Sequence, residues 1–203
     1  GITIFNDGFV NCHRNLWRGA GVLIPVFSLR SENSMGVGEF SDIKLLIDWA
    51  KKTGLKLIQL LPVNDTTANH NFHDSYPYAA ISAFALHPLF INLEKIAGTA
   101  HSNLLRPIKR KQKKLNELRL FDYEEVMSLK LTTLQNLFNV LKEDLKKDLV
   151  YFEFFELNRH WLVPYAAFSF LRDKYKTPDS ANWEAYKNYN EEAIQELVSP
   201  TQE

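Results

Sequence analysis

The stretch AGVLIPVF at residues 20–27, followed by SDIKLLIDWAKKT at 41–53 and LKLIQLL at 55–61, decides the fold. The first and third segments are apolar runs of strand length, as expected for strands that are buried on both faces. Apolar side chains recur with helical spacing in the middle segment, at Ile43, Leu46, Ile47 and Ala50. Strand, helix and strand in this order predict a parallel pair with a right-handed crossover. The fold class is therefore α/β, as a sheet or a barrel.

The same stretch marks where its elements begin and end. We expect Ser41 to cap the helix, with Phe40 and Leu45 packing across its first turn as a hydrophobic staple. Gly54 is expected to end the helix, because glycine accepts the left-handed conformation at that position. Pro25 cannot donate to a strand ladder and suggests the end of the first strand.

Composition excludes several classes of protein. The 24 Lys and Arg balance 24 Asp and Glu, so no net positive field attracts nucleic acid, and 45% hydrophobic residues exclude a disordered chain. No apolar run approaches the roughly 20 residues that a membrane helix needs, so we expect no membrane partner. Cys12 is the single cysteine, which rules out a disulfide framework and fits a reducing compartment. We therefore expect a cytoplasmic protein.

The second half of the chain has helical character. All 8 glycines lie at or before Gly98, whereas apolar residues recur with helical period from Asn103 onward. Pro164 is expected to kink or interrupt the third of these helices. Helices are expected over 103–119, from near 123 to 145, over 154–174 and, in one or two short pieces, within 183–198.

Three motifs admit a functional and a plainer interpretation. Gly36-Val37-Gly38 lacks the third glycine and the tight turn of a dinucleotide site, which favours a flexible loop. The run at 106–114 holds six cations in nine residues, and we favour a solvated helix face over a nucleic-acid patch. A metal site could be drawn from the residues of one loop, but their spacing does not support it, so no metal or cofactor is expected. Those residues are His70, His73, Asp65 and Asp74.

The segment at 72–91 is the most informative for function. Tyr76 and Tyr78 flank Pro77, which stiffens the backbone and holds two aromatic faces on a loop after the second strand. Ligands bind at that end of parallel strands. Aromatic faces stack on the apolar faces of sugar rings, and Asp74 and Ser75 can bond sugar hydroxyls. The alternative, that these rings pack the loop onto the sheet, stays open at this point.

Three motifs carry a resemblance to a known family. They lie at residues 18–30 with 36–40, at 58–65, and at 75–78 running into 82–89, and their order and spacing match. On these residues the chain resembles the 4-α-glucanotransferases (amylomaltase or disproportionating enzyme, glycoside hydrolase family 77). The resemblance is strong over 17–98 and weaker in the helical part, where Phe121-Asp122-Tyr123, Lys130 and Trp161 carry it.

The resemblance implies a fold, a domain organisation and sugar-binding residues. It implies the N-terminal portion of a (β/α)8 TIM barrel over 18–98, followed by an α-helical insertion subdomain over 99–203. The extra Tyr76 and the Leu86-His87-Pro88 motif resemble the plant-cytosolic and Bacteroidetes-type subgroup. Residues 1–17 would then lead out of a preceding domain. The family's donor-site tyrosine maps onto Tyr78 and its preceding serine onto Ser75.

The implied activity is transfer of α-1,4-glucan segments between maltooligosaccharides or glycans by a retaining mechanism, which needs two carboxyl groups about 5–5.5 Å apart. No pair with an arguable spacing occurs among the acids near the site, which are Glu32, Glu39, Asp65 and Asp74. We expect the catalytic groups after Glu203, so this chain alone should be inactive and should pair with the rest of the barrel or with itself. The alternatives are a non-catalytic α-glucan-binding or structural fragment and a different TIM-barrel glycoside hydrolase.

Overall fold

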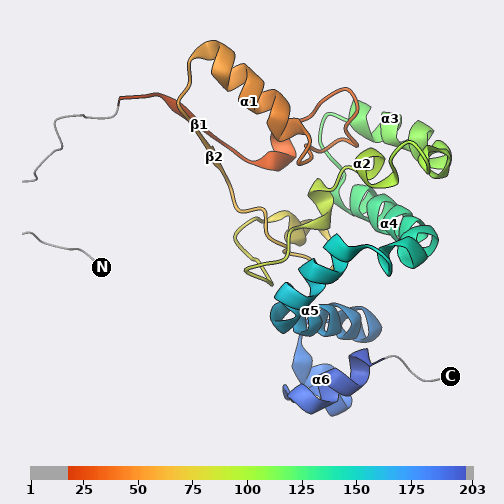
Figure 1. The fold of residues 1–203 in the computed structure, drawn as a ribbon. Coiled ribbons are helices and arrows are strands. Elements are labelled where there is room, and N and C mark those ends of the chain that lie inside the picture. Colours follow the sequence, from red (N-terminus) through yellow and green to blue (C-terminus); the bar gives the residue numbers. More distant parts are fainter. Residues whose placement is uncertain (1–17, 200–203) are drawn as a thin grey trace, which may run out of the picture.

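The computed structural model describes residues 18–199, so the predicted leader at 1–17 lies outside the described residues. Strands β1 (Gly21–Ile24) and β2 (Leu57–Leu60) pair in parallel, with Gly21 opposite Leu57. Helix α1 (Asp42–Thr53) connects them (Figure 1). The predicted parallel pair and its bridging helix are confirmed.

The strands are shorter and more exposed than predicted. Strand β1 ends just before Pro25, as that proline suggested, and Val26–Ser28 form a 3-10 turn in place of the last part of the predicted strand at 20–27. Leu23 and Leu57 are more than half exposed, so the prediction of burial on both faces is wrong for the described residues. The physical reason is that β1 and β2 form a sheet of two strands, which leaves one face of each strand uncovered.

The start of α1 also differs from the prediction. The Ser41 side chain accepts no capping hydrogen bond, and the Asp42 carboxylate instead accepts the backbone N–H of Glu39 at 2.7 Å. Leu45 is 60% exposed, so it forms no staple with Phe40, whose ring packs on Phe90 at 5.5 Å. The end of the helix is as predicted, because the residue after it, a glycine, has a φ of 77°.

Helices account for most of the described chain from Asn103 onward, as predicted. The α-helices are α2 (Leu93–Ala97), α3 (Lys109–Glu117), α4 (Tyr123–Leu145), α5 (Leu149–Tyr175) and α6 (Glu191–Val198). Short 3-10 helices lie at Phe72–Ser75, Pro88–Phe90, Ser102–Ile108, Ser180–Asn182 and Glu184–Tyr186. Helix α5 begins before the predicted Phe154 because the Asp148 side chain accepts the N–H of Val150 at 2.8 Å, and it continues past Pro164. Within residues 18–199, no helix combines the length and the apolar composition that a membrane span requires.

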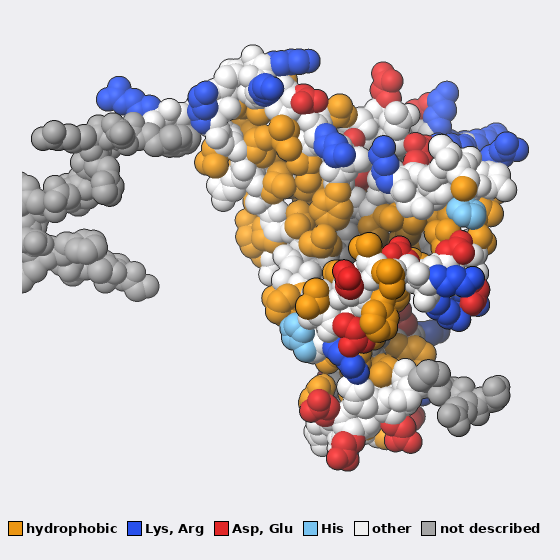
Figure 2. All heavy atoms as spheres, in the orientation of Figure 1, with side chains coloured by type: hydrophobic (Ala, Val, Ile, Leu, Met, Phe, Trp, Pro, Cys, Tyr) orange, Lys and Arg blue, Asp and Glu red, His pale blue; other side chains and the backbone are white. Residues whose placement is uncertain are grey.

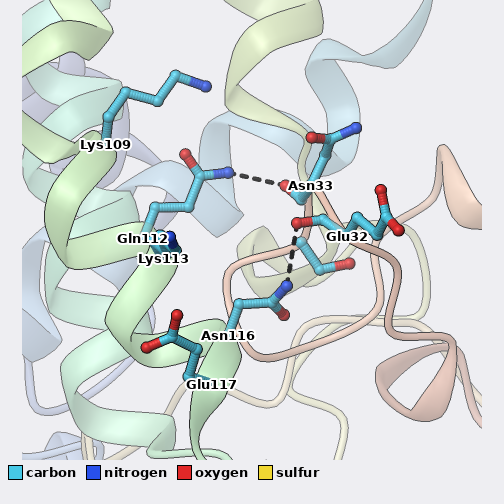
Figure 3. A pocket seen from close by; sticks show the side chains of 8 residues that line it. Glu32, Asn33, Lys109, Gln112, Lys113, Asn116 and Glu117 are labelled. Atoms are coloured by element: carbon cyan, nitrogen blue, oxygen red, sulfur yellow. Dashed lines mark hydrogen bonds between the residues drawn. The ribbon is translucent and has the colours of Figure 1, made fainter.

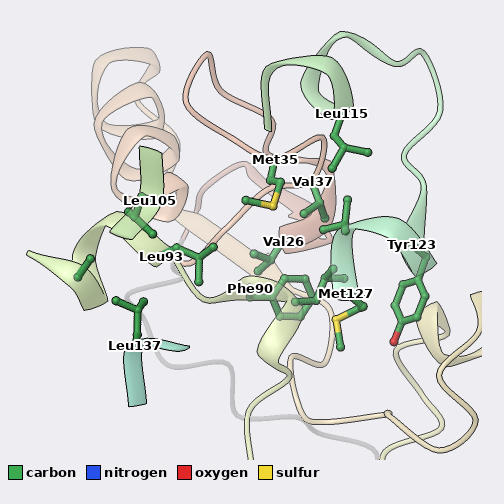
Figure 4. Close-up of a cluster of buried hydrophobic side chains, with 13 residues drawn as sticks. Val26, Met35, Val37, Phe90, Leu93, Leu105, Leu115, Tyr123, Met127 and Leu137 are labelled. Carbon is green, nitrogen blue, oxygen red and sulfur yellow. The ribbon is translucent and has the colours of Figure 1, made fainter. Parts of the chain in front are cut away.

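The main core joins the loops around the sheet to α2, α3 and α4 (Figure 4). Within it, the Gly36-Val37-Gly38 loop is packed rather than flexible, which corrects the prediction. Val37 is fully buried, and a Cβ on Gly36 would lie 2.6 Å from the carbonyl oxygen of Leu115. Gly36 therefore allows close packing against α3, and Gly38 allows close packing against the turn at Val26–Leu29.

A polar pocket between this loop and α3 shows how the two are held together (Figure 3). The Gln112 amide donates to the carbonyl of Asn33 at 2.7 Å, and the Asn116 amide donates to the carbonyl of Glu32 at 3.1 Å. Since these amides bond the loop backbone, the pocket is a structural junction. In the basic run, Lys109 and Lys111 on α3 form ion pairs with Glu94 and Glu125, as expected for a solvated helix face.

A buried ion pair ties α4 to the rest of the molecule. Lys130 is fully buried, and its ammonium contacts the Glu39 carboxylate at 2.6 Å and the carbonyls of Leu89 and Ile91 at 2.6 and 2.7 Å. The second Glu39 oxygen accepts from the Asn92 amide at 2.5 Å. Every donor of the ammonium thus has an acceptor, which a charge in this position requires.

Removing the Lys130 side chain should therefore destabilise the fold. We expect Lys130→Ala to lower the free energy of unfolding by about 3–5 kcal/mol, because the Glu39 carboxylate stays buried without its partner. Urea denaturation of the chain measures this loss. The matched control is Lys146→Ala, which breaks the exposed pair with Glu143 and should leave the free energy of unfolding nearly unchanged.

A second variant separates loss of the pair from loss of packing. Adding Glu39→Gln to Lys130→Met removes the unpaired charge while an unbranched side chain fills the space. We expect the double variant to be more stable than Lys130→Met alone. If both variants lost the same free energy of unfolding, the unpaired Glu39 charge would not be the cause of the loss.

Candidate functional site

The predicted site residues all lie on the loop that follows β2 (Figure 1). The loop is closed at its base by an antiparallel bridge between Asn64 and Leu86, and the N–H of Asp65 donates to the carbonyl of Ala85 at 2.8 Å. It extends from the carboxyl end of β2, which is the end of a parallel sheet where ligands bind.

Tyr76 and Tyr78 form an exposed aromatic pair on this loop. Their ring centroids are 5.6 Å apart, the planes are inclined by 52°, and the side chains are 60% and 61% exposed. Pro77 lies between them, and Ser75 directly precedes them in a half-buried position. Such exposure argues against the alternative that the two rings pack the loop onto the sheet.

Asp74 precedes this pair in the chain, and its carboxylate points into the loop. Its buried carboxylate accepts the backbone N–H groups of Ala68, Asn69 and His70 at 3.1, 2.9 and 2.7 Å. The Thr66 hydroxyl donates to its carbonyl oxygen. These bonds fix the turn that carries the aromatic pair, while a direct sugar contact of Asp74 stays a prediction.

Asp65 connects the loop to α5. One of its oxygens accepts the Thr67 hydroxyl at 2.6 Å, and the other accepts the Tyr165 hydroxyl at 2.6 Å. Burial and the neighbouring Asp65 carboxylate raise the pKa of Tyr165, so this phenol keeps its proton and remains a donor. The buried Arg172 guanidinium donates to the carbonyl of Thr67 from the same helix.

His87 closes the base of the loop in its neutral form. Its Nδ1 accepts the N–H of Leu89 at 3.1 Å, which leaves the proton on Nε2, 3.3 Å from the Tyr123 hydroxyl. Burial lowers the pKa of His87, although the Asp65 carboxylate lies 3.9 Å away and opposes the shift. The side chain is thus a structural hydrogen-bonding group at physiological pH.

A second aromatic stack lies where the loop meets α5. Phe84, which is 58% exposed, stacks on Trp161 with centroids 5.4 Å apart and planes inclined by 19°. The Trp161 indole N–H donates to Asn158 at 2.9 Å, which fixes the ring. This stack adds apolar surface to the loop that already carries Tyr76 and Tyr78.

Most of the acids and histidines considered for chemistry have structural partners, whereas Glu32 and His73 are exposed. Glu39 pairs with Lys130, and His70 bonds Asp173 at 2.7 Å rather than joining His73 around an ion. Within 18–199, no three His, Cys, Asp or Glu side chains are grouped as metal ligands would be. The sequence predicted no carboxylate pair for glycosyl transfer among the acids near the loop. In the structure, three of these acids, Asp65, Asp74 and Glu39, are buried and hydrogen-bonded.

Sequence reasoning missed Tyr165, Arg172 and the structural role of Asp65. Tyr165 and Asp65 lie 100 residues apart, and Arg172 bonds a carbonyl 105 residues away. Neither contact has a local spacing that a single sequence could reveal. The one available signal was the position of Tyr165 and Arg172 seven residues apart, on one face of a helix rich in aromatics.

Comparison with known proteins gives consistent matches. Residues 24–203 match the family model described as 4-alpha-glucanotransferase, glycoside hydrolase family 77. A 4-alpha-glucanotransferase of Oryza sativa subsp. japonica is 40% identical over 197 residues, which is 97% of this chain and 20% of the relative. One of Chlamydia caviae is 34% identical over 176 residues, covering 84% of this chain and 32% of the relative. The chain therefore spans between a fifth and a third of the length of these relatives.

The neutral His87 predicts how stability depends on pH. Because its pKa is lower in the folded chain than the roughly 6.5 of the unfolded chain, the unfolded chain takes up a proton first as the pH falls. This contribution to stability is complete above about pH 6.5 and is lost below it. Asp65 and Asp74 on the loop favour the protonated form, whereas Lys130 on α4 opposes it.

We expect His87→Asn to reduce the fall in unfolding free energy between about pH 7 and pH 5, because an amide can still accept the Leu89 N–H but does not titrate. Urea denaturation at several pH values measures this slope. Val150→Ala, at an exposed residue without an ionisable group, is the control and should leave the slope unchanged. Identical slopes for all three proteins would contradict the prediction.

Proposed function

Since the chain belongs to the 4-alpha-glucanotransferase family, glycoside hydrolase family 77, we propose that it is part of an enzyme that transfers α-1,4-glucan segments between maltooligosaccharides or glycans by a retaining mechanism. Its own contribution is a sugar-binding loop after β2. The observation that carries this proposal is the exposed Tyr76 and Tyr78 pair on a loop whose backbone is held by a buried carboxylate.

The chemistry of the pair suits a glucan. A pyranose ring presents apolar C–H faces and polar hydroxyl edges, so an aromatic ring gains dispersion contacts and loses little hydration by stacking on it. Tyr78 supplies the face for one glucose unit, with Tyr76 beside it, and the Ser75 hydroxyl can bond a sugar hydroxyl. Because Asp74 and Pro77 hold the turn, little conformational entropy is lost when the sugar binds.

We propose that this chain forms the first βα units of a (β/α)8 barrel, with a helical subdomain after residue 98. Exposed apolar side chains support this, since further βα units of a barrel would cover them. Figure 2 shows hydrophobic side chains gathered below α1, and the exposed ones on β1, α1 and β2 include Leu23, Leu45, Ile47, Trp49 and Leu57. The same surface favours self-association of the chain by itself.

The catalytic carboxylates are proposed to lie in a part of the enzyme outside this chain, because three of the four acids near the loop are buried and bonded to structural partners. A cytoplasmic location is proposed from the single cysteine. The family match removes the alternative of an unrelated barrel glycosidase. A glucan-binding role without catalysis remains the second candidate for the chain by itself, supported by the same engaged acids.

The test of the sugar-binding loop is Tyr78→Ala in the complete enzyme. We expect kcat/KM for maltooligosaccharide donors to fall, because the stacking surface is lost. The fall should correspond to a loss of roughly 1–3 kcal/mol of transition-state binding energy. The melting temperature should change little, since the side chain is exposed. Steady-state kinetics and calorimetry measure the two quantities.

Tyr151→Ala is the matched control, because Tyr151 is also an exposed tyrosine but lies on α5 away from the loop sequence. It should alter neither quantity. Unchanged kinetics with a melting temperature lowered as for a buried aromatic, which costs about 3–5 kcal/mol, would make Tyr78 a packing residue and refute the proposal.

A further inference from the structure

The C-terminal part of the described chain contains a pocket that the sugar-binding loop does not share. It lies between the second half of α5, the segment at 178–190 and α6, and its volume is about 260 Å³. Its base is a small core of its own, in which Trp183 packs on Phe168 with centroids 5.4 Å apart. The pocket is lined by Pro164, Phe168, Leu171, Pro178, Ser180, Trp183, Tyr186, Asn188, Tyr189, Asn190 and Ile194.

The floor of the pocket is rigid and aromatic. Trp183 is 5% exposed, and its indole N–H donates to the carbonyl of Thr177 at 2.9 Å, which fixes the orientation of the ring. Asn190 caps α6 by accepting the N–H of Ala193 at 3.0 Å, so this rim residue is also fixed. A ligand would therefore enter a formed pocket.

The lining selects a neutral ligand. None of the eleven lining residues is Asp, Glu, Lys, Arg or His, so the pocket offers nothing to balance the charge of a phosphate or an amine. The pocket is just below the roughly 300–1,000 Å³ typical for drug-sized ligands, which suits a single ring.

The rim offers both of the groups that a sugar needs. Tyr189 is 71% exposed and presents an aromatic face. Within 18–199, the Ser180 hydroxyl, the Asn188 amide and the Tyr189 hydroxyl make no side-chain hydrogen bond to a described residue, so they are available to a ligand. Apolar faces beside amide and hydroxyl groups match the two kinds of surface on a pyranose ring.

We propose that this pocket is a second carbohydrate-binding site, which holds one glucose unit of an α-glucan against Tyr189 and Trp183. The choice of α-glucan as the ligand rests on the proposed function, whereas the neutral-ring chemistry rests on the pocket. No lining residue belongs to the loop after β2, so the site anchors a glucan at a position other than Tyr78.

The experiment is a titration of the isotope-labelled chain with maltotriose, followed by NMR of backbone amides and indole N–H groups. We expect the signals of Trp183, Asn188 and Tyr189 to shift with a saturable dependence. Tyr189→Ala should weaken this response by about five- to tenfold, as expected for loss of an aromatic contact, while Tyr189→Phe should retain most of it. Tyr151→Ala, outside the pocket, should bind as the unaltered chain does.

The outcomes separate this site from the proposed function. Shifts confined to the loop around Tyr78, or pocket shifts that survive Tyr189→Ala unchanged, would overturn the second site and leave the proposed function standing. Pocket shifts that need about five- to tenfold more maltotriose in Tyr189→Ala, with the loop shifts intact, support it. No shift anywhere at saturating maltotriose would also overturn it, whereas transfer activity of the complete enzyme tests the proposed function independently.

Discussion

The buried pair of Lys130 and Glu39 is the interaction on which the rest of this structure depends. The Glu39 carboxylate lies just before α1, the Lys130 ammonium comes from the middle of α4, and the carbonyls of Leu89 and Ile91 complete the shell. Burial raises the pKa of Glu39 and lowers that of Lys130, so each charge persists in the core only because the other is there. The sheet, its connecting helix and the helical half are thereby joined at one point.

That junction also positions the loop after β2. His87, at the base of the loop, accepts the N–H of Leu89, and the carbonyl of Leu89 accepts from Lys130. Leu89 therefore links the base of the loop directly to the buried pair. From the other side, Tyr165 on α5 holds the loop through Asp65. The loop is therefore fixed by two helices that have no strand between them, and the helical half supports the surface that we propose binds sugar.

Charged and aromatic side chains have different places on the loop after β2. The Asp65 and Asp74 carboxylates on the loop are buried and accept hydrogen bonds from neighbouring groups, which gives them structural roles. Aromatic rings occupy the exposed positions instead, at Tyr76, Tyr78 and Phe84. A surface of this kind suits the neutral glucan chain that we propose it binds.

The sequence by itself determined the parallel pair, the helix between its strands, the end of that helix at Gly54 and the helix over 123–145, because periodicity and glycine conformation are local properties. It also placed the aromatic pair around Pro77 on a loop. Only the tertiary structure decided that Asp74 points inward and that Lys130 is buried, as it decided that Tyr165 reaches Asp65. Those contacts join residues far apart in the chain, and a hydrogen bond across 100 residues leaves no periodic trace in either segment.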